Sequence, residues 1–481
     1  MIAHTTINDL LENRKSLYFT VALSILYVLP LLIANVYYQD DHARAMYAHG
    51  WSHDGRFINN WINKLITLSN FKFSLYPVTL ILSALLLGVS GYVLCGLWKV
   101  EYTKNLKWSS LLLLISPFYL ANLPYRYDAL FMSLSIFVLI IPYAYFYKKK
   151  HFLLISILCF YLSLGMYEPS VSIYLMVGVV FIYQFLEKND FRKAFIYIGL
   201  MIIACLVGYL FYHFTKLGLN INAYNERIQL VFFQPNYQFL IKEKLLMFYE
   251  IYSLLYNDKY YYMMLILLIP IISVAQLIIQ KKSFFYISKI FLLRGCLLAV
   301  CFMLFIGPNV LIKADYLPLR ALPAFGVFTF ILVCFLREFK GAYLFFFRLL
   351  LVLNTLYCFN LMAQTANALY NQKQYQEMFV YDLNSVVRTY DVKKISYKGE
   401  IGYARKSYKI FEQFPFIKTI VQREIGASAW FSQDVLSFSG IQEIVEFIPY
   451  DPQIENYELV FKSYVYNLYI VHEGHFLIEF N

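Results

Sequence analysis

Charged residues are scarce in this sequence of 481 residues. Asp, Glu, Lys and Arg make up only 15% of the chain, whereas 60% is hydrophobic and 20% is aromatic. A soluble domain cannot hide so much apolar surface, and several apolar runs reach the ~20 residues that a helix needs to cross a bilayer. None of these runs alternates in the way that membrane β-barrel strands do. The sequence therefore predicts an all-α polytopic membrane protein.

Cysteines in a metal-binding or disulfide pattern are also missing. All of them lie inside apolar runs, and we interpret them as small core residues. They are Cys95, Cys159, Cys205, Cys296, Cys301, Cys334 and Cys358. The sequence likewise has no GxxxxGK[ST] loop of the kind that binds nucleotide phosphates, no internal repeat and no low-complexity segment.

The apolar runs predict eleven membrane spans. They cover residues 17–38, 73–97, 108–123, 129–147, 152–167, 169–186, 194–212, 262–280, 290–312, 321–336 and 343–363. Residues 152–186 are too long for one span, so we expect a bend at the MYEPS stretch. Arg14 and Lys15 precede a first run that is longer than the apolar core of a signal peptide, which predicts an uncleaved signal-anchor.

The net charge of +11 reports membrane topology rather than binding to nucleic acid. The basic residues cluster between the apolar runs, where they favour the cytoplasmic side and contact anionic lipid headgroups. With the N-terminus inside, every inner loop is basic. These loops hold Arg14, Lys15, Lys99, Lys104, Lys107, Lys148, Lys149, Lys150, Lys188, Arg192, Lys193, Lys281, Lys282, Lys289, Arg337 and Lys340. The outer loops then hold isolated charges and prolines near span ends, a pattern typical of an active site at the outer membrane surface.

Two segments outside the spans, residues 55–68 and 239–256, have the spacing of helices that lie in the membrane surface. Such helices either flank a lateral entry for a lipid-linked substrate or simply pack on the bundle. After a transmembrane domain of residues 1–363, the composition predicts a small α/β domain over 364–481, outside the membrane. In that domain we expect a helix over 374–390 and strands in 393–399 and 467–480, the last around a turn at Glu473-Gly474.

Asp40 and Asp41 follow the first span directly. One interpretation is a solvated helix end or an N-cap. The other is a general base, because partial burial and a neighbouring like charge both raise a carboxyl pKa. The pair would also suit Mg²⁺ or Mn²⁺, which prefer oxygen ligands. His49 and His53 are spaced for zinc on one helix face, but without a third ligand they are weak evidence for a metal site.

Further charged residues sit at the outer ends of other spans. Arg126 and Asp128 in PYRYD form either a structural pair or a phosphate contact with its orienting partner, and Arg320 between two prolines is placed similarly. Glu168, after Tyr167, is a second catalytic group, an acceptor for a sugar hydroxyl, or a solvated turn.

Four stretches that occur in order carry a resemblance to a known family: YYQDDHARAMYAHGWSHDGRFINNWI, NLPYRYDALFMSLS, LGMYEPSVSIYL and IGPNVLIKADYLPLRALPAFG. They resemble the signature stretches of the bacterial glucosyltransferases that modify O-antigen, the serotype-converting glucosyl transferases of temperate phages. The resemblance covers about residues 35–325. It implies a GT-C architecture in the bacterial inner membrane, a polyprenyl-phosphate sugar donor, typically of glucose, and a lipid-linked glycan acceptor on the periplasmic side. Companion proteins that make and flip the donor are also implied.

The resemblance also suggests roles for individual residues. An acidic residue of the first outer loop is the usual candidate for the catalytic carboxylate, which maps here onto Asp40 or Asp41. We expect a donor-phosphate group consisting of Arg44, Arg126 and Arg320. We expect a substrate-binding group consisting of Trp51, Arg56, Asp128, Tyr167, Glu168 and Asp315. Glu168 departs from the Gln that we expect at this position in many relatives.

Two other function classes remain open at this point. A transporter or flippase of lipid-linked sugars would need polar residues deep within the spans, where this sequence has few; Arg294 and Arg348 lie near the inner face. A glycan polymerase or ligase would use an oligosaccharide-diphosphate donor. The C-terminal domain, on the same side as the candidate site, is expected to help choose the acceptor.

Overall fold

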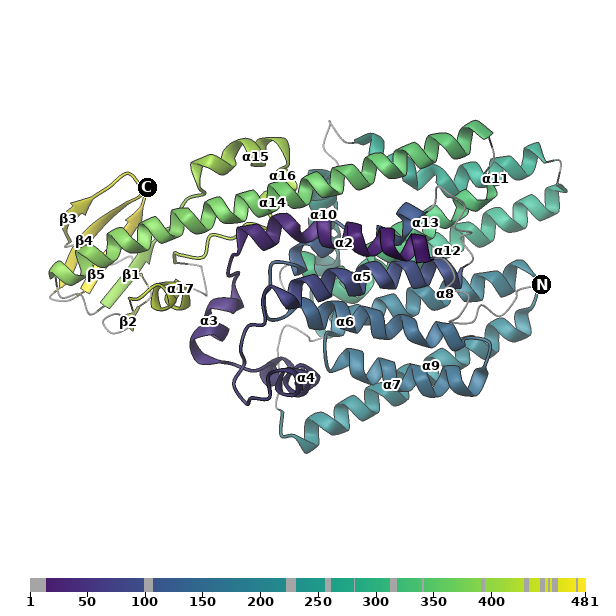
Figure 1. Cartoon of the computed structure of the whole chain (residues 1–481), viewed down its shortest axis with the longest axis horizontal. Coiled ribbons are helices and arrows are strands. Elements are labelled where there is room, and N and C mark those ends of the chain that lie inside the picture. The colour runs from purple at the N-terminus through teal and green to yellow at the C-terminus, as the bar shows by residue number, and fades with distance from the viewer. Residues whose placement is uncertain are drawn as a thin grey trace.

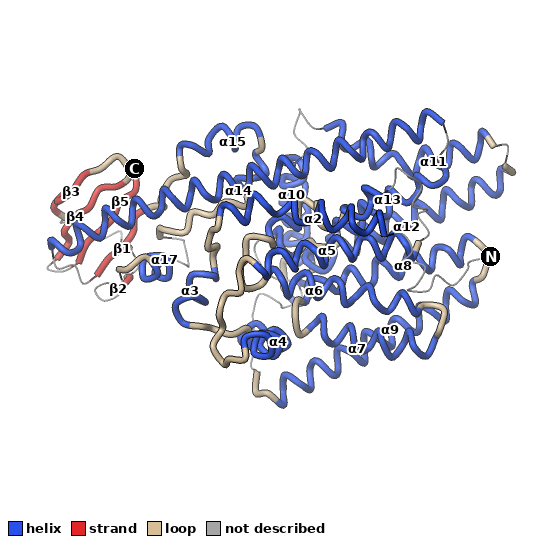
Figure 2. The backbone as a smooth tube through the Cα atoms, viewed as in Figure 1, coloured by secondary structure: helices blue, strands red, loops and turns tan. Residues whose placement is uncertain are grey.

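The computed structural model shows a helical body with a small sheet at one end, joined by one long helix (Figure 1). It describes residues 14–98, 107–221, 231–255, 261–280, 282–311, 318–339, 341–390, 394–427, 432–441, 446–448, 450–451, 457–472 and 475–481. Strands occur only at the sheet end, and the rest of the described chain is helix and loop (Figure 2).

The body is built from apolar helices. They are α2 (Arg14–Ala34), α5 (Val78–Leu97), α6 (Ala129–Ile140), α7 (Lys149–Leu164), α8 (Val171–Glu187), α9 (Phe191–Gly218), α10 (Tyr237–Leu255), α11 (Ile269–Ile279), α12 (Phe284–Val310), α13 (Phe325–Cys334) and α14 (Gly341–Tyr390). Among the described residues, six helical stretches are long and apolar enough to cross a membrane, and three more are apolar but shorter. This agrees with a polytopic membrane protein, but the expected count of eleven spans is not confirmed.

The third expected span, over 108–123, is not a continuous helix. It consists of two short 3-10 helices, η2 (Lys107–Leu111) and η3 (Tyr119–Asn122), joined by turns around Pro117. The segment is buried between its neighbours, and irregular backbone at membrane depth is tolerated where protein surrounds it. Two glycines allow the close fit, because a Cβ at Gly91 would lie 2.0 Å from the Ser110 carbonyl oxygen and one at Gly326 2.9 Å from the Leu113 Cα.

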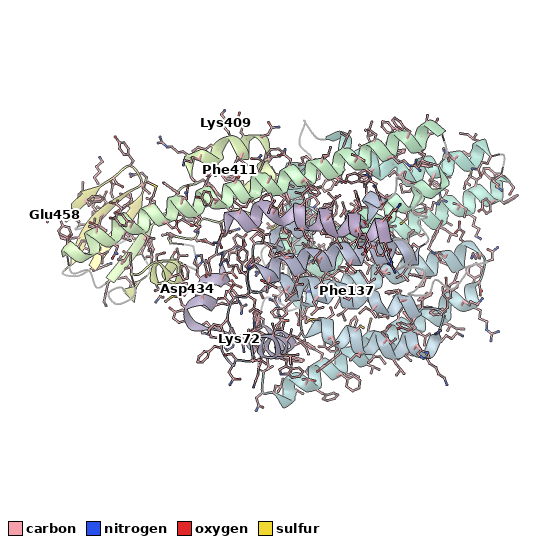
Figure 3. The ribbon with its side chains drawn as sticks, in the orientation of Figure 1. Lys72, Phe137, Lys409, Phe411, Asp434 and Glu458 are labelled. Carbon is pink, nitrogen blue, oxygen red and sulfur yellow. The ribbon has the colours of Figure 1, made fainter. Side chains whose placement is uncertain are left out.

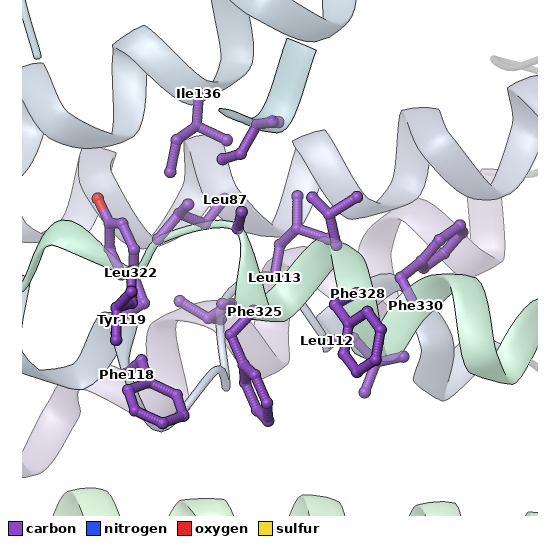
Figure 4. Packing of buried hydrophobic residues seen from close by; sticks show 14 of the residues in the cluster. Leu87, Leu112, Leu113, Phe118, Tyr119, Ile136, Leu322, Phe325, Phe328 and Phe330 are labelled. Atoms are coloured by element: carbon purple, nitrogen blue, oxygen red, sulfur yellow. The ribbon is translucent and has the colours of Figure 1, made fainter. Parts of the chain in front are cut away.

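The main hydrophobic core holds these helices together. Figure 4 shows Phe118 of the irregular segment near Phe325 of α13, in the same buried cluster as Leu87 of α5 and Ile136 of α6. The Phe118 and Phe325 rings pack edge to face at 4.8 Å between centroids. Because burying one large apolar side chain is worth about 1.5–3 kcal/mol, this core fixes the helix ends that carry the polar outer loops.

The C-terminal sheet has five strands in the order β2-β1-β5-β4-β3. The strands are β1 (Lys394–Lys398), β2 (Glu446–Phe447), β3 (Glu458–Lys462), β4 (Tyr466–His472) and β5 (His475–Phe480). β1 is parallel to β2 and β5, while β3, β4 and β5 are antiparallel. Both predicted strand regions are confirmed, and the predicted turn at Glu473-Gly474 lies outside the described residues. A separate core joins the sheet to the last turns of α14 through residues such as Phe379, Leu383 and Ile478.

The chain after α14 does not belong to the sheet alone. The short helices α15 (Tyr408–Gln413) and α16 (Pro415–Lys418) return to the helical body, where Phe416 and Ile420 belong to the main core. From Ile425 onward the chain joins the core of the sheet. The boundary expected at residues 363 and 364 falls inside α14, which runs unbroken from the body to the sheet (Figure 1).

Candidate functional site

The first outer loop begins where α2 ends at Ala34 and leads into α3 (Asp40–Tyr47). α3 and then α4 (Phe57–Thr67) lie at the end of the body that faces the sheet (Figure 1). Gln39, just before α3, has φ 50° and ψ −115°, a conformation that L residues rarely adopt. Such a backbone persists only where surrounding contacts impose it. The loop is therefore held in shape from outside.

Asp41 ties this loop to the PYRYD segment. Its side chain is fully buried, and its Oδ2 accepts hydrogen bonds from the backbone N–H groups of Tyr38 at 3.1 Å and Arg126 at 3.0 Å. Its Oδ1 accepts a third from Tyr127 at 3.4 Å. Burial raises the pKa of Asp41 well above its usual range, against the lowering effect of the amide bonds. With its oxygens enclosed by backbone donors, Asp41 is placed to hold structure.

Asp128 is the centre of a second buried polar cluster. Its Oδ1 accepts a hydrogen bond from the Trp51 indole at 2.6 Å. The Arg44 guanidinium lies 3.3 Å from Oδ2, and that of Arg56 lies 3.8 Å from Oδ1. Arg44 also stacks over the Trp51 ring at 4.8 Å. The cluster gathers four of the residues that the sequence singled out.

Asp40 differs from both of these carboxylates. It is partly exposed, and no hydrogen bond or ion pair to its carboxylate is recorded within the described chain. Burial raises its pKa; the positive charges of Arg320 and Arg44 lower it, and the negative charge of Asp128 raises it. Asp40 is thus an unengaged carboxylate among charged groups, with a pKa shifted in the direction that suits a general base.

Arg320 is linked by hydrogen bonds, through Tyr125, to Gln39, the residue before Asp40. It belongs to the short helix η9 (Leu319–Ala321), and its Nη1 donates to the Tyr125 hydroxyl at 2.7 Å. The Tyr125 hydroxyl in turn donates to the Gln39 side-chain oxygen. The Arg320 carbonyl accepts hydrogen bonds from Asn122 and from the Tyr167 hydroxyl. Among the described residues, no carboxylate forms an ion pair with Arg320, whose guanidinium donates to Tyr125.

The Arg126 guanidinium is turned away from Asp128. It donates to the Val36 carbonyl at 2.7 Å and to the Asn35 side-chain oxygen. It is also sandwiched between the rings of Tyr37 at 4.0 Å and Tyr76 at 4.2 Å. It stands at the polar end of an open groove between α2 and α5, lined by Leu32, Ile33, Asn35, Tyr76, Pro77, Ile81 and Arg126. No ion pair joins it to Asp128 in the part of the chain that the structure describes.

Tyr167 and Glu168 are further expected site residues. Tyr167 is buried under the Arg56 guanidinium, which lies 5.3 Å from its ring. Glu168 accepts a hydrogen bond from Tyr212 of α9 at 2.7 Å. Asp315 lies outside the described residues. Within the described chain, no three His, Cys, Asp or Glu side chains are grouped as metal ligands.

Comparison with known proteins places this chain in a family. The family model described as "Glucosyl transferase GtrII" matches residues 29–336. The chain belongs to the GtrII glucosyl transferase family. A GtrII-family chain is a glycosyltransferase, and the match spans all of the site residues described above from Asp40 to Arg320.

One curated relative of this GtrII-family chain comes from Salmonella phage P22. It is described as an uncharacterized 55.3 kDa protein in the gtrB 5′ region and is 26% identical over 443 residues, covering 88% of this chain and 90% of the phage protein. No solved structure matches the chain.

The GtrII match ends before the C-terminal part, yet that part contacts the candidate site. The Tyr38 hydroxyl donates to the Ile420 carbonyl at 2.6 Å, and the Gln39 N–H donates to Glu424 at 2.7 Å. Helix α17 (Ser432–Phe438) packs on α3, with the Phe438 ring 4.6 Å from that of Tyr37. Figure 3 shows Asp434 of α17 at this junction.

The sequence carries no signal for these contacts between the C-terminal part and the first outer loop. Glu424 and Gln39 are 385 positions apart, and no motif or spacing connects them. Tyr125, the link between Arg320 and Gln39, lay inside a quoted motif, but a tyrosine there carries no signal of its own.

Proposed function

We propose that this chain transfers a sugar, glucose in the first instance, from a polyprenyl-phosphate donor to a lipid-linked O-antigen or another cell-surface glycan. The reaction takes place on the periplasmic face of the bacterial inner membrane, where Asp40 is the general base and Arg320 binds the donor phosphate. One observation supports this assignment most strongly: the partly exposed Asp40 carboxylate, which has no hydrogen bond within the described chain, lies in the electrostatic field of Arg320, and Arg320 pairs with no described carboxylate.

The chemistry needs only these two charged groups. The acceptor hydroxyl oxygen attacks the anomeric carbon of the donor sugar while Asp40 takes the hydroxyl proton. The bond from that carbon to the phosphate oxygen breaks, and its electron pair leaves with the phosphate. The Arg320 guanidinium balances the charge that develops there, because its planar fork matches phosphate oxygens. Attack from the side opposite the phosphate inverts the anomeric centre.

The other arginines are less free to bind a phosphate. Arg44 is buried and pairs with Asp128 at 3.3 Å. Arg56 lies between Asp128 at 3.8 Å and Asp54 at 3.9 Å. Arg126 already donates to the loop that precedes α3. We therefore assign Arg44 and Arg56 to the support of Asp128 and Trp51, and Arg126 to the shape of the loop.

Features of the surface fit a lipid-linked substrate. The groove between α2 and α5 is apolar along Leu32, Ile33 and Ile81, so it suits a polyprenyl tail. In α4, Trp61 and Leu65 are 48% and 74% exposed, and this apolar face suits the membrane interface. With the N-terminus in the cytoplasm, the sheet domain lies in the periplasm beside the site, where it helps choose the acceptor. Separate companion proteins make and flip the donor.

Sugar transfer by membranes that carry the protein tests this function. The membranes receive polyprenyl-phosphate glucose and the host's lipid-linked glycan, and insertion is checked in parallel. Asp40→Asn should abolish transfer at normal insertion. The matched control is Asp54→Asn, an exposed carboxylate of the same outer loop, which should retain most transfer. Product from an oligosaccharide-diphosphate donor alone would indicate a polymerase or ligase, and movement of a lipid-linked glycan without product would indicate a flippase.

A further inference from the structure

The buried carboxylate of Glu424 has no part in the transfer step, although it lies at the candidate catalytic loop. Only 6% of the residue is exposed. Its Oε1 accepts a hydrogen bond from the Gln39 backbone N–H at 2.7 Å. The neighbouring Arg423 pairs instead with Glu400. A buried carboxylate costs stability unless it is hydrogen-bonded. The bond from the Gln39 N–H is the one that satisfies Glu424 in the described chain.

We propose that Glu424 is a positioning residue that fixes the Gln39 peptide and thereby sets the place of Asp40 relative to Arg320. This role rests on the proposed glycosyl transfer. It gives the C-terminal part, which lies beyond the matched family region, a function in assembling the site.

The geometry of Gln39 explains why such a residue is needed. Its φ of 50° with ψ −115° is unfavourable for a residue with a side chain. Glu424 holds its N–H, and the Tyr125 hydroxyl holds its side-chain oxygen. Because Asp40 is the next residue and begins α3, rotation of the Gln39 backbone would move the Asp40 carboxylate directly.

The same contacts connect the base to the cation. Tyr125 donates to Gln39 and accepts from Arg320 at 2.7 Å. The chain Glu424–Gln39–Tyr125–Arg320 therefore joins both reacting charges to one buried anchor. If the anchor is lost, the separation between Asp40 and Arg320 is no longer fixed.

Glu424 also stands at the joint between two cores. Ile420 and Val421 belong to the core of the helical body, whereas Ile425 belongs to the core of the sheet domain. The Ile425 carbonyl accepts a hydrogen bond from the Ile401 N–H at 2.9 Å, which anchors the segment to the sheet domain. A shift of the sheet domain, such as one on acceptor binding, would therefore act on Gln39 through Glu424.

The anchor should respond to pH. Burial raises the pKa of Glu424 to about 7, against the lowering effect of the Gln39 N–H. The charges of Arg320 and Asp40 act on the neighbouring Tyr38 phenol together with that of Glu424. Arg423, next in sequence to Glu424, pairs with Glu400. On the body side, Lys373 of α14 donates to the Asn35 carbonyl at 3.2 Å. Above pH 7 the charged carboxylate is the stronger acceptor, and below pH 7 it becomes a neutral one.

Three proteins test this role: wild type, Glu424→Gln and Glu424→Ala, with Glu412→Gln, an exposed carboxylate of α15, as the control. Glutamine keeps an acceptor oxygen and imitates the protonated form. At pH 8 we expect wild type to transfer about 5-fold faster than Glu424→Gln and at least ~10-fold faster than Glu424→Ala. At pH 6, wild type and Glu424→Gln should converge. The loss should appear in kcat, with the KM for the donor unchanged.

A constant ratio between wild type and Glu424→Gln at both pH values would overturn the role, as would full transfer by Glu424→Ala. Should Glu424→Ala fail to accumulate, the near-isosteric Gln variant alone decides through its pH profile. Failure of the proposed function looks different, because then wild type itself makes no product from polyprenyl-phosphate glucose.

Discussion

Asp40 and Asp41 are adjacent, yet backbone donors enclose Asp41 whereas we propose Asp40 as the general base, and substitution should separate the two. Asp41→Ala removes the acceptor for three buried backbone N–H groups, two at 3.0 and 3.1 Å and a weaker third at 3.4 Å. An unsatisfied buried donor costs about 1–3 kcal/mol, so we expect a loss of about 3–6 kcal/mol in the free energy of unfolding. Asp41→Asn keeps one oxygen, which can serve Tyr38 and Arg126, and should lose only about 1–2 kcal/mol.

Asp40→Asn should not lower stability, because no described group bonds to that carboxylate and burial disfavours its charge. The assay is thermal unfolding of the detergent-purified variants, followed by intrinsic fluorescence, with the amount of inserted protein measured beside it. Unfolding of Asp41→Ala at the wild-type temperature would contradict a structural role for the Asp41 carboxylate. Destabilisation of Asp40→Asn by as much as Asp41→Ala would contradict the difference between the two aspartates.

Three further results are expected. Arg320→Ala should lower the rate of transfer by about 100-fold or more, as the loss of a hydrogen-bond donor to the transition state does, and Arg320→Lys should restore only part of that rate. Equal rates in both variants and wild type would contradict a phosphate contact. His42 is a buried residue of α3. Burial lowers its pKa from 6.5 to about 4, so between these pH values the unfolded chain binds a proton that the folded chain does not. Stability should therefore fall as pH drops from 6.5 to 4, by up to about 3 kcal/mol, and His42→Asn should show a smaller fall in denaturant titrations. Chelation of divalent cations with EDTA should leave transfer unchanged, because Arg320 supplies the positive charge; a loss that Mg²⁺ or Mn²⁺ restores would show otherwise.

Membrane class and the C-terminal strands could be predicted because they depend on local pattern. Apolar runs identify candidate spans by composition, and the stretches that form β1 and the β4–β5 pair are short and rich in the β-branched and aromatic residues that strands favour. The segment 108–123 shows the limit of this reasoning. It is as apolar as a span, but other helices surround it, and composition does not distinguish burial in protein from burial in lipid.

The site was predictable as a set of residues but not as an arrangement. The sequence identified Asp40, Asp41, Arg126 and Asp128 because charges at span ends are conspicuous. It left open an ion pair between Arg126 and Asp128. In the structure Asp128 pairs with Arg44, and the Arg126 guanidinium donates to the Val36 carbonyl. Which of the two aspartates is enclosed depends on the backbone turn at Gln39, which no spacing rule reveals.

The contribution of the C-terminal part depends on tertiary contacts that only the fold supplies. Glu424 lies in a segment with mixed charges and no motif, and its significance comes entirely from burial against Gln39. A buried carboxylate at a junction of two cores is invisible in sequence, because its neighbours are set by the return of α16 to the helical body.

The central claim is that Asp40 is the base of a sugar transfer from a lipid phosphate. The most direct measurement is the rate of glucose transfer from polyprenyl-phosphate glucose by purified wild type and Asp40→Asn in lipid vesicles, at equal amounts of folded protein. We expect transfer by wild type and a loss of at least ~100-fold in the variant, with donor binding retained. Transfer by Asp40→Asn at the wild-type rate would contradict it.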